Sequence, residues 1–146
     1  MIVCELRDCA KRYDGRDVLR GAALQVEQGE LFGIAGRSGA GKTTLLRIVA
    51  GLEKADSGEA HLGGQIAASA SRWLAPERRG VAMVFQTLGL WPHLTAFEHL
   101  DLVLRRRFRN RGEREAEAVR LLNLVEIGEL AGRAPGQMSG GERQRL

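Results

Sequence analysis

One stretch of this sequence, Gly36-Arg37-Ser38-Gly39-Ala40-Gly41-Lys42-Thr43, matches the phosphate-loop pattern G-x-x-x-x-G-K-[ST] at every fixed position. The apolar run before it, residues 31–35, predicts a buried strand, and residues 43–50 after it predict a helix that Gly51 ends. Strand, glycine loop and helix follow one another in the order that the motif requires. A chance glycine turn is the alternative, which at average composition arises in roughly one chain of this length in a few hundred. The flanking elements make it the poorer explanation.

The residue types in this loop suit a triphosphate and a magnesium ion. Glycines let backbone N–H groups approach phosphate oxygens that a Cβ would block, and the helix beginning near Lys42 adds the positive end of its dipole. Lys42 is expected to reach the β- and γ-phosphates, and the Thr43 hydroxyl to complete a Mg²⁺ shell. The residues expected to bind ATP in this segment are Gly36, Ser38, Gly39, Ala40, Gly41, Lys42, Thr43 and Thr44.

Length and composition are those of a globular protein. The 146 residues predict one domain or part of a larger one, and a hydrophobic content of 44% is enough for a core. No apolar run approaches the length of a membrane span, and the N-terminus lacks the shape of a signal peptide, so we expect a soluble, cytoplasmic protein.

Cys4 and Cys9 are too few for a disulfide framework. Their odd spacing predicts opposite faces of one strand, and we expect buried free thiols.

The net charge is +4, and the densest basic run is residues 105–111. A solvated helix end and loop is the preferred interpretation of this run, because arginines at a helix C-terminus complement the helix dipole. No set of base-stacking aromatic residues accompanies it. We therefore expect no nucleic acid among the partners.

The first half of the chain predicts short strands and turns. Residues 2–35 read as strands with turns between them, and Gly63-Gly64 after residues 59–62 predicts a hairpin edge, followed by a loop or short helix at residues 65–75. Residues 81–85 are a second continuous apolar run and predict a second buried strand. Gln86 follows it, at the strand end where α/β sheets bind ligands. The alternative for Gln86 is a strand end that faces water.

The second half predicts helices. Thr95 and Glu98 form a capping-box pattern that predicts a helix from there to about Arg107, and residues 113–125 predict another. The apolar residues 90–94 suit either the core or a partner contact. Near the end, Ser139 is a good N-cap followed by Gly140 and Gly141, whose amides offer a second anion site at a helix N-terminus.

Taken together, these motifs resemble the ATP-binding subunits of ABC transporters over essentially the whole chain. Gln86 is similar to the family's Q-loop glutamine. The stretch Ser139-Gly140-Gly141-Glu142 resembles the LSGGQ signature, with Met138 for Leu and Glu142 for Gln. Tyr13 falls where the family places an aromatic residue that stacks on adenine. Residues 85–95 resemble the Q-loop region of bacterial importer ATPases for polyamines, iron, sulfate, molybdate or sugars.

The resemblance implies an α/β fold: a P-loop NTPase core with an antiparallel β subdomain and a helical subdomain. It implies a β subdomain plus α/β core at residues 1–86, a helical subdomain at 87–138, and the signature with the start of the next helix at 139–146. In the family, the Walker B strand and the switch histidine follow that helix. We therefore expect a partial nucleotide-binding domain, truncated before the Walker B strand and inactive in hydrolysis alone, because its base and Mg²⁺ organiser are absent.

The resemblance also implies roles and partners. Lys42, Gln86 and Ser139 would be catalytic, with Thr43 and Gln86 at Mg²⁺, and Ser139 and Gly141 would act on the ATP of a partner subunit. That partner would be a second ABC subunit in a head-to-tail homo- or heterodimer. Permease subunits would hold the dimer at the inner face of the cell membrane, near residues 88–94, and ATP hydrolysis would drive transport. The alternatives are a truncated, non-hydrolysing nucleotide-binding fragment and a soluble ABC ATPase acting on nucleic acid.

Overall fold

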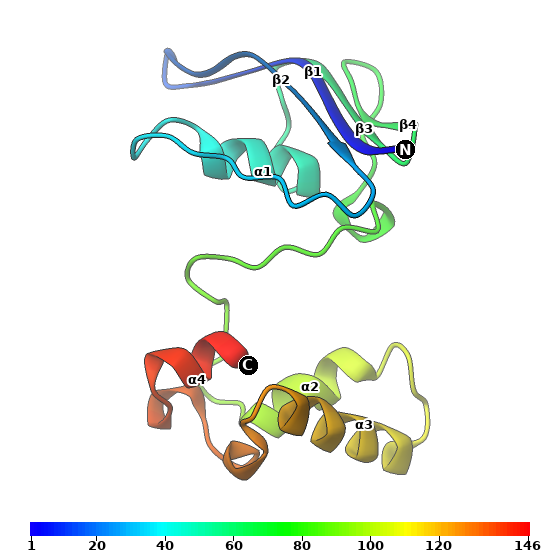
Figure 1. Cartoon of the computed structure of the whole chain (residues 1–146), viewed down its shortest axis with the longest axis vertical. Helices are drawn as coiled ribbons and strands as arrows, with labels where there is room; N and C mark the ends of the chain where they lie inside the picture. The colour runs from blue at the N-terminus through cyan, green and yellow to red at the C-terminus, as the bar shows by residue number, and fades with distance from the viewer. The chain divides into compact units, whose positions relative to one another are not determined.

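A four-stranded antiparallel sheet and one helix make up the first of two units, residues 1–83 and 84–146, in a computed structural model that describes all 146 residues (Figure 1). The strand order is β2-β1-β3-β4. The strands are β1 (Ile2–Tyr13), β2 (Arg16–Glu27), β3 (Ser57–Leu62) and β4 (Gln65–Ala68). The subdomain limits expected from the resemblance stay predictions.

Both hairpins of the sheet turn on two consecutive residues with positive φ. Asp14 (φ 48°) and Gly15 (φ 79°) join β1 to β2, and Gly63 (φ 54°) and Gly64 (φ 77°) join β3 to β4. Such pairs form the tight turns whose twist matches that of the flanking strands. The hairpin expected from Gly63-Gly64 is therefore confirmed. Its second strand, β4, occupies the first four of the residues 65–75, where the sequence predicted a loop or short helix, so that prediction was wrong for residues 65–68.

Helix α1 (Lys42–Ala50) packs against the sheet (Figure 1). Its Leu45 and Ile48 join Leu6, Cys9 and Ala60 of the sheet in one core cluster. The predicted stop is confirmed, because Gly51 adopts φ 80° and its N–H reaches the carbonyls of Arg47 and Ile48.

Strand β1 is irregular where it pairs with both neighbours. Asp8 has φ 48°, and the pairing with β2 shifts between Leu6 and Cys9. Leu6 and Cys9 consequently both enter the core despite their odd spacing, so the parity rule used for Cys4 and Cys9 does not hold along this strand. Both cysteines are free thiols, with Cys9 buried and Cys4 half-buried. Burial raises the pKa of each thiol.

The two continuous apolar runs are not strands, which contradicts the sequence prediction. Residues 31–35 and 81–85 form no ladder, and Leu31 and Val84 are 100% and 87% exposed. Ile34 alone in the first run packs against the core. An apolar run predicts burial, but a strand also needs a neighbour for its N–H and C=O groups. The four strands of the sheet pair with one another, and neither run pairs with them.

A buried arginine ties α1 to the far edge of the sheet. The Arg79 side chain donates to Ile48 O (2.7 Å) and Val49 O (3.0 Å) in the last turn of α1, and to Ala67 O (3.3 Å) in β4. A cation suits the negative end of a helix dipole. The guanidinium also lies over the Trp73 ring, 4.7 Å from its centroid. Helix, edge strand and the loop before Arg79 are thus fastened by one side chain.

Replacing Arg79 tests this link. Arg79→Leu leaves buried carbonyls without donors, so the free energy of unfolding should fall by about 2–3 kcal/mol. Arg78→Leu is the matched control, because Arg78 is exposed and makes no hydrogen bond through its side chain. Urea unfolding of the three chains measures the difference. Equal midpoints for Arg79→Leu and Arg78→Leu would contradict the role given to Arg79.

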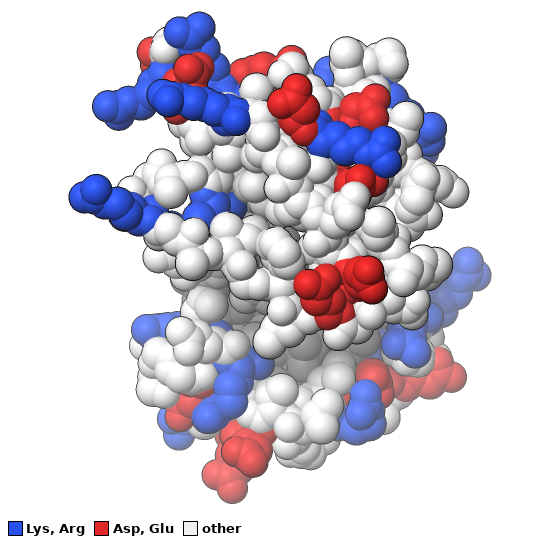
Figure 2. All heavy atoms as spheres, turned by 45° about the horizontal axis from the view of Figure 1, so that its top comes forward, with Lys and Arg blue, Asp and Glu red and all other residues white.

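Charged residues of both signs are interspersed on the face drawn in Figure 2. In the first unit, Lys11 contacts Glu53 at 3.0 Å and Asp56 at 3.2 Å, and Arg12 lies 3.3 Å from Asp17. These basic side chains of the first unit are thus paired with carboxylates beside them. The expectation that nucleic acid is not a partner stays a prediction.

The second unit is helical. Its helices are α2 (Ala96–Leu104), α3 (Arg111–Leu124) and α4 (Gly140–Arg145), joined by short 3-10 turns at Gly128–Leu130 and Pro135–Gln137. A third such turn, Pro76–Arg78, belongs to the first unit. The core of the second unit consists of Ala96, Leu122, Ile127 and Met138. None of the helices in the chain combines the length and apolar character needed to cross a bilayer.

The predicted caps are confirmed. Thr95 Oγ1 accepts from Glu98 N, and the Glu98 carboxylate accepts from Thr95 N, which is a complete capping box. The helix ends at Leu104, earlier than the predicted Arg107. The next helix begins at Arg111, ahead of the predicted residue 113, because the Asn110 side chain accepts from the amides at its start.

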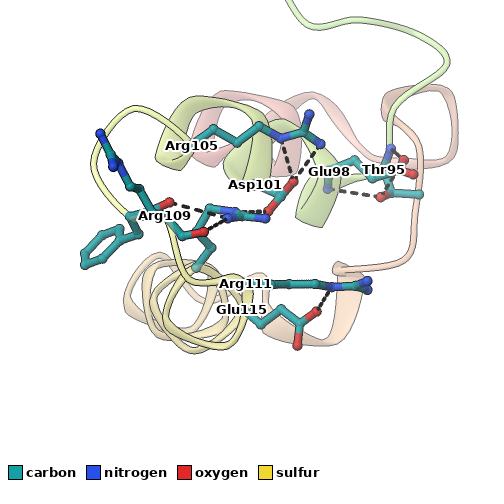
Figure 3. A network of polar contacts seen from close by, with 9 residues as sticks. Thr95, Glu98, Asp101, Arg105, Arg109, Arg111 and Glu115 are labelled. Atoms are coloured by element: carbon teal, nitrogen blue, oxygen red, sulfur yellow. Dashed lines mark hydrogen bonds and ion pairs between the residues drawn. The ribbon is translucent and has the colours of Figure 1, made fainter.

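Asp101 joins the two longer helices of this unit. Its carboxylate accepts from Arg114 Nε of α3 (2.7 Å) and from Arg105 Nη2 of its own helix (2.9 Å), as Figure 3 shows for Arg105. Arg114 also donates to Arg109 O (3.0 Å) in the connecting loop. Arg114 and Arg105 hold the pKa of the Asp101 carboxyl below its usual value. The side chain that closes the α2–α3 hairpin is therefore Arg114, outside the basic run at residues 105–111, to which that run adds only the carbonyl of Arg109.

This carboxylate predicts a pH dependence. Because its pKa is lowered in the folded state, its ionisation stabilises the fold above the pKa of an unfolded aspartate, about 4. The stabilisation is lost as pH falls through the folded pKa. Asp101→Asn should lower the thermal midpoint at neutral pH, and its difference from the parent chain should shrink in acid. The control Glu115→Gln removes an exposed pair with Arg111 and should change little. A pH-independent Asp101→Asn effect would contradict this.

Candidate nucleotide site

The phosphate loop is held against β2 by a glycine. Gly41 is buried and adopts φ 84°, and a Cβ on it would lie 2.8 Å from both Leu19 Cδ2 and Val18 O. Only glycine fits this position, both for the conformation and for the space. The loop is closed by a hydrogen bond from Ala40 N to Arg37 O (3.2 Å), and Leu45 N donates to Gly41 O (2.9 Å) as the helix begins.

The start of α1 offers free donors. Its N-cap, Gly41, has no side chain to accept from the first amides, and no acidic residue lies in the first turn. Lys42 Nζ lies at the loop, donating to Gly36 O and Arg37 O at 2.8 Å each. Thr43 is exposed and Thr44 half-buried. Unsatisfied N–H groups beside an ammonium are an arrangement that attracts an anion.

Tyr13, predicted to stack on adenine, lies in the same unit as the loop. Its side chain is 39% exposed, and Lys11 Nζ is 5.2 Å from the ring centroid. Burial and hydrogen bonding to Glu53 raise the pKa of the Tyr13 hydroxyl, whereas its contact with Thr44 lowers it. The hydroxyl therefore lies close to the first turn of α1, two residues beyond Lys42.

The other predicted site residues belong to the second unit. Gln86 is exposed in a turn. Ser139 caps α4, accepting from Glu142 N at 3.3 Å, while the Glu142 carboxylate accepts from Ser139 N at 2.6 Å. This contact lowers the pKa of Glu142. Gly141 is exposed in the first turn of α4. The Ser139 hydroxyl also forms a side-chain hydrogen bond with the Glu142 carboxylate, so both groups of the capping box are engaged with each other.

The second unit also carries a groove of about 330 Å³ that sequence reasoning did not locate. Its lining residues are Trp91, His93, Leu94, Glu98, Asp101, Leu102 and Arg105. The charged members are satisfied within the unit, since Glu98 serves the capping box and Asp101 binds Arg105. The lining residues without such partners are therefore Trp91, His93 and the two leucines, a mostly apolar set. The apolar run at residues 90–94 was the signal that could have found it.

Comparison with known proteins decides the family. A family model described as "ABC transporter" matches residues 19–146. The chain belongs to the ABC transporter family. The resemblance inferred from the motifs is confirmed.

Curated ABC relatives align with nearly all of the chain. The sn-glycerol-3-phosphate import ATP-binding protein UgpC of Cereibacter sphaeroides is 41% identical over 100% of this chain and 41% of that protein. The sulfate/thiosulfate import ATP-binding protein CysA of Methylococcus capsulatus is 44% identical over 97% of this chain and 41% of that protein. The spermidine/putrescine import ATP-binding protein PotA of Hahella chejuensis is 40% identical over 99% and 38%. The chain spans about two fifths of the length of these relatives.

Solved ABC structures share the fold. A dimeric bacterial ABC transporter cassette gives a TM-score of 0.80 at 28% identity, over 97% of this chain and 66% of that chain. A dimeric ATP-binding cassette in a post-hydrolysis state, bound to ADP and Pi, gives a TM-score of 0.78 at the same identity and coverage. The expected α/β fold, with an antiparallel sheet and a helical part, is confirmed.

The tight contact of the ABC phosphate loop with β2 leads to a test. Gly41→Ala should destabilise the chain by about 1–3 kcal/mol more than Gly39→Ala, because only the first adds a clash with Val18 and Leu19. Gly39 shares the positive φ (79°) but has open space around it. Urea unfolding of both variants measures the difference, and equal losses would show that the loop is not wedged against β2.

Proposed function

We propose that this chain is the ATP-binding part of an ABC import ATPase. The observation that carries the proposal is the uncapped N-terminus of α1, with Lys42 Nζ 2.8 Å from two carbonyls of the loop around it. Donors without partners at a helix start, framed by glycines, suit the phosphates of a nucleotide.

The side chains of the first unit would divide the work of holding Mg-ATP. Lys42 has three donors, so its ammonium can turn from Gly36 O and Arg37 O to the β- and γ-phosphates. The exposed Thr43 hydroxyl would bind Mg²⁺, which neutralises phosphate charge when bound. Tyr13, with its ring partly exposed beside Thr44, would stack on the adenine.

The second unit would act on the nucleotide of a partner. In a head-to-tail dimer with a second ABC subunit, the Ser139 hydroxyl and the Gly141 amide would donate to the γ-phosphate held by the other subunit. Gln86 would contact Mg²⁺ and the attacking water. Support comes from the dimeric solved relatives and from the exposure of Ser139 and Gly141 at the start of α4.

The groove would receive a membrane-spanning permease subunit. Its free surface is mostly apolar, so the matching element is a helix that presents apolar side chains. The names of the relatives favour import, but the substrates in those names differ, so no substrate is assigned to this chain. The place of the chain would be the cytoplasmic face of the membrane, reached through that permease.

For residues 1–146 we propose ATP binding rather than hydrolysis. Hydrolysis requires a base positioned for the attacking water. In the first unit, the Glu53 carboxylate lies beside Tyr13 and is engaged by Lys11 at 3.0 Å. These residues therefore hold the nucleotide, and turnover depends on further groups.

The direct test is Lys42→Ala. Removing the ammonium should weaken Mg-ATP binding about 10- to 100-fold, the worth of charge-assisted hydrogen bonds. Folding should be unaffected, because the side chain bonds only to exposed loop carbonyls. Calorimetric titration of the chain with Mg-ATP measures affinity, and circular dichroism checks the fold.

The matched control is Lys54→Ala, which removes an exposed ammonium that makes no hydrogen bond. It should bind Mg-ATP like the parent chain. An unchanged affinity in Lys42→Ala, or an equal loss in both variants, would contradict the assignment of the phosphate loop.

A further inference from the structure

A buried histidine in the second unit has both ring nitrogens occupied. His99 is 6% exposed. Its Nε2 lies 2.9 Å from the backbone nitrogen of Trp91, and its Nδ1 lies 2.7 Å from the backbone oxygen of Thr95. An N–H donates and a carbonyl accepts, so Nδ1 must carry the proton and Nε2 must be the acceptor. These contacts therefore require a neutral ring in one tautomer.

The bond from Trp91 to His99 fastens an otherwise loose segment. Residues 84–94 contain no helix or strand, and their other hydrogen bonds are local, such as Leu88 N to Phe85 O and Leu94 N to Trp91 O. No other hydrogen bond joins residues 84–94 to α2, α3 or α4. The imidazole is consequently the polar anchor of this segment on α2.

The same histidine also contacts the side chain that it anchors. The Trp91 and His99 ring centroids are 5.7 Å apart, with the planes tilted by 32°. Trp91 lines the groove, whereas the buried His99 is not among its lining residues. His99 thus does not face the groove itself, and it can affect a molecule bound there only through its contact with Trp91.

We propose that His99 is a positioning residue that holds Trp91 in place as one wall of the groove. The inference rests on the proposed role of that groove in receiving an apolar helix of a permease. A groove binds such a helix tightly when its walls are already in place, because ordering a loose segment on binding costs affinity. The neutral imidazole supplies this order by giving Trp91 N–H an acceptor and Thr95 O a donor.

Two substitutions at position 99 distinguish a positioning role of His99, through its hydrogen bonds, from a packing role of its ring. His99→Phe keeps a ring of similar shape but removes both hydrogen bonds. His99→Gln keeps one acceptor and one donor in its carboxamide. His93→Gln is a matched control, because His93 is an exposed histidine on the same groove that makes no hydrogen bond.

Amide hydrogen exchange, followed residue by residue in the full 146-residue chain, reads the proposed bond directly. The Trp91 amide is the donor to His99, so in His99→Phe it should exchange about tenfold faster, the effect of losing one hydrogen bond. The Ile127 amide, bonded to Leu122 O in the core of the same unit, should be unchanged. His99→Gln should recover part of the protection, and His93→Gln should match the parent chain.

Two results would overturn the proposal. Unchanged exchange at Trp91 in His99→Phe would show that the imidazole does not hold this segment. Equal acceleration at Trp91 and Ile127 would show that His99 stabilises the whole unit rather than this wall. The measurement uses neither nucleotide nor partner. A chain that keeps this exchange pattern but binds no Mg-ATP would therefore count against the proposed function alone.

Discussion

The placement of α1 on the sheet is the constraint on which the candidate nucleotide site depends. At its first turn, Gly41 lies so close to Val18 and Leu19 that no side chain fits between them. At its last turn, the Arg79 guanidinium holds the carbonyls of Ile48 and Val49 together with β4. A helix fixed at both ends keeps its free amides in one place, so the phosphate oxygens of the proposed nucleotide would meet donors that need no rearrangement.

The sequence predicted best those features that short-range hydrogen bonds determine. The helix after the phosphate loop, its stop at Gly51 and the caps at Thr95 and Ser139 are all confirmed, because each involves residues within four positions of one another. It predicted poorly what depends on distant partners. The runs at residues 31–35 and 81–85 have the composition of buried strands, but composition does not reveal whether a neighbouring strand is present.

The roles of Arg79 and His99 also depend on distant partners, so the sequence did not predict them. In the sequence, Arg79 looks like part of a polar turn, and His99 looks like one residue of an amphipathic helix. Their roles arise from carbonyls and amides up to 31 positions away, at Ile48 for Arg79 and at Trp91 for His99. For His99 a local signal existed, since the residue four positions after an N-cap lies over that cap's carbonyl. For Arg79 no local pattern indicates the burial.

The exposed apolar runs have a consequence for the behaviour of the chain in a cell. Leu31 and Val84 are exposed in runs that pair with no strand, and exposed apolar segments with free backbone groups accept strands from other molecules. Chaperones and proteases act on exposed features of this kind. As long as both runs stay unpaired, residues 1–146 are open to self-association as well as to unfolding.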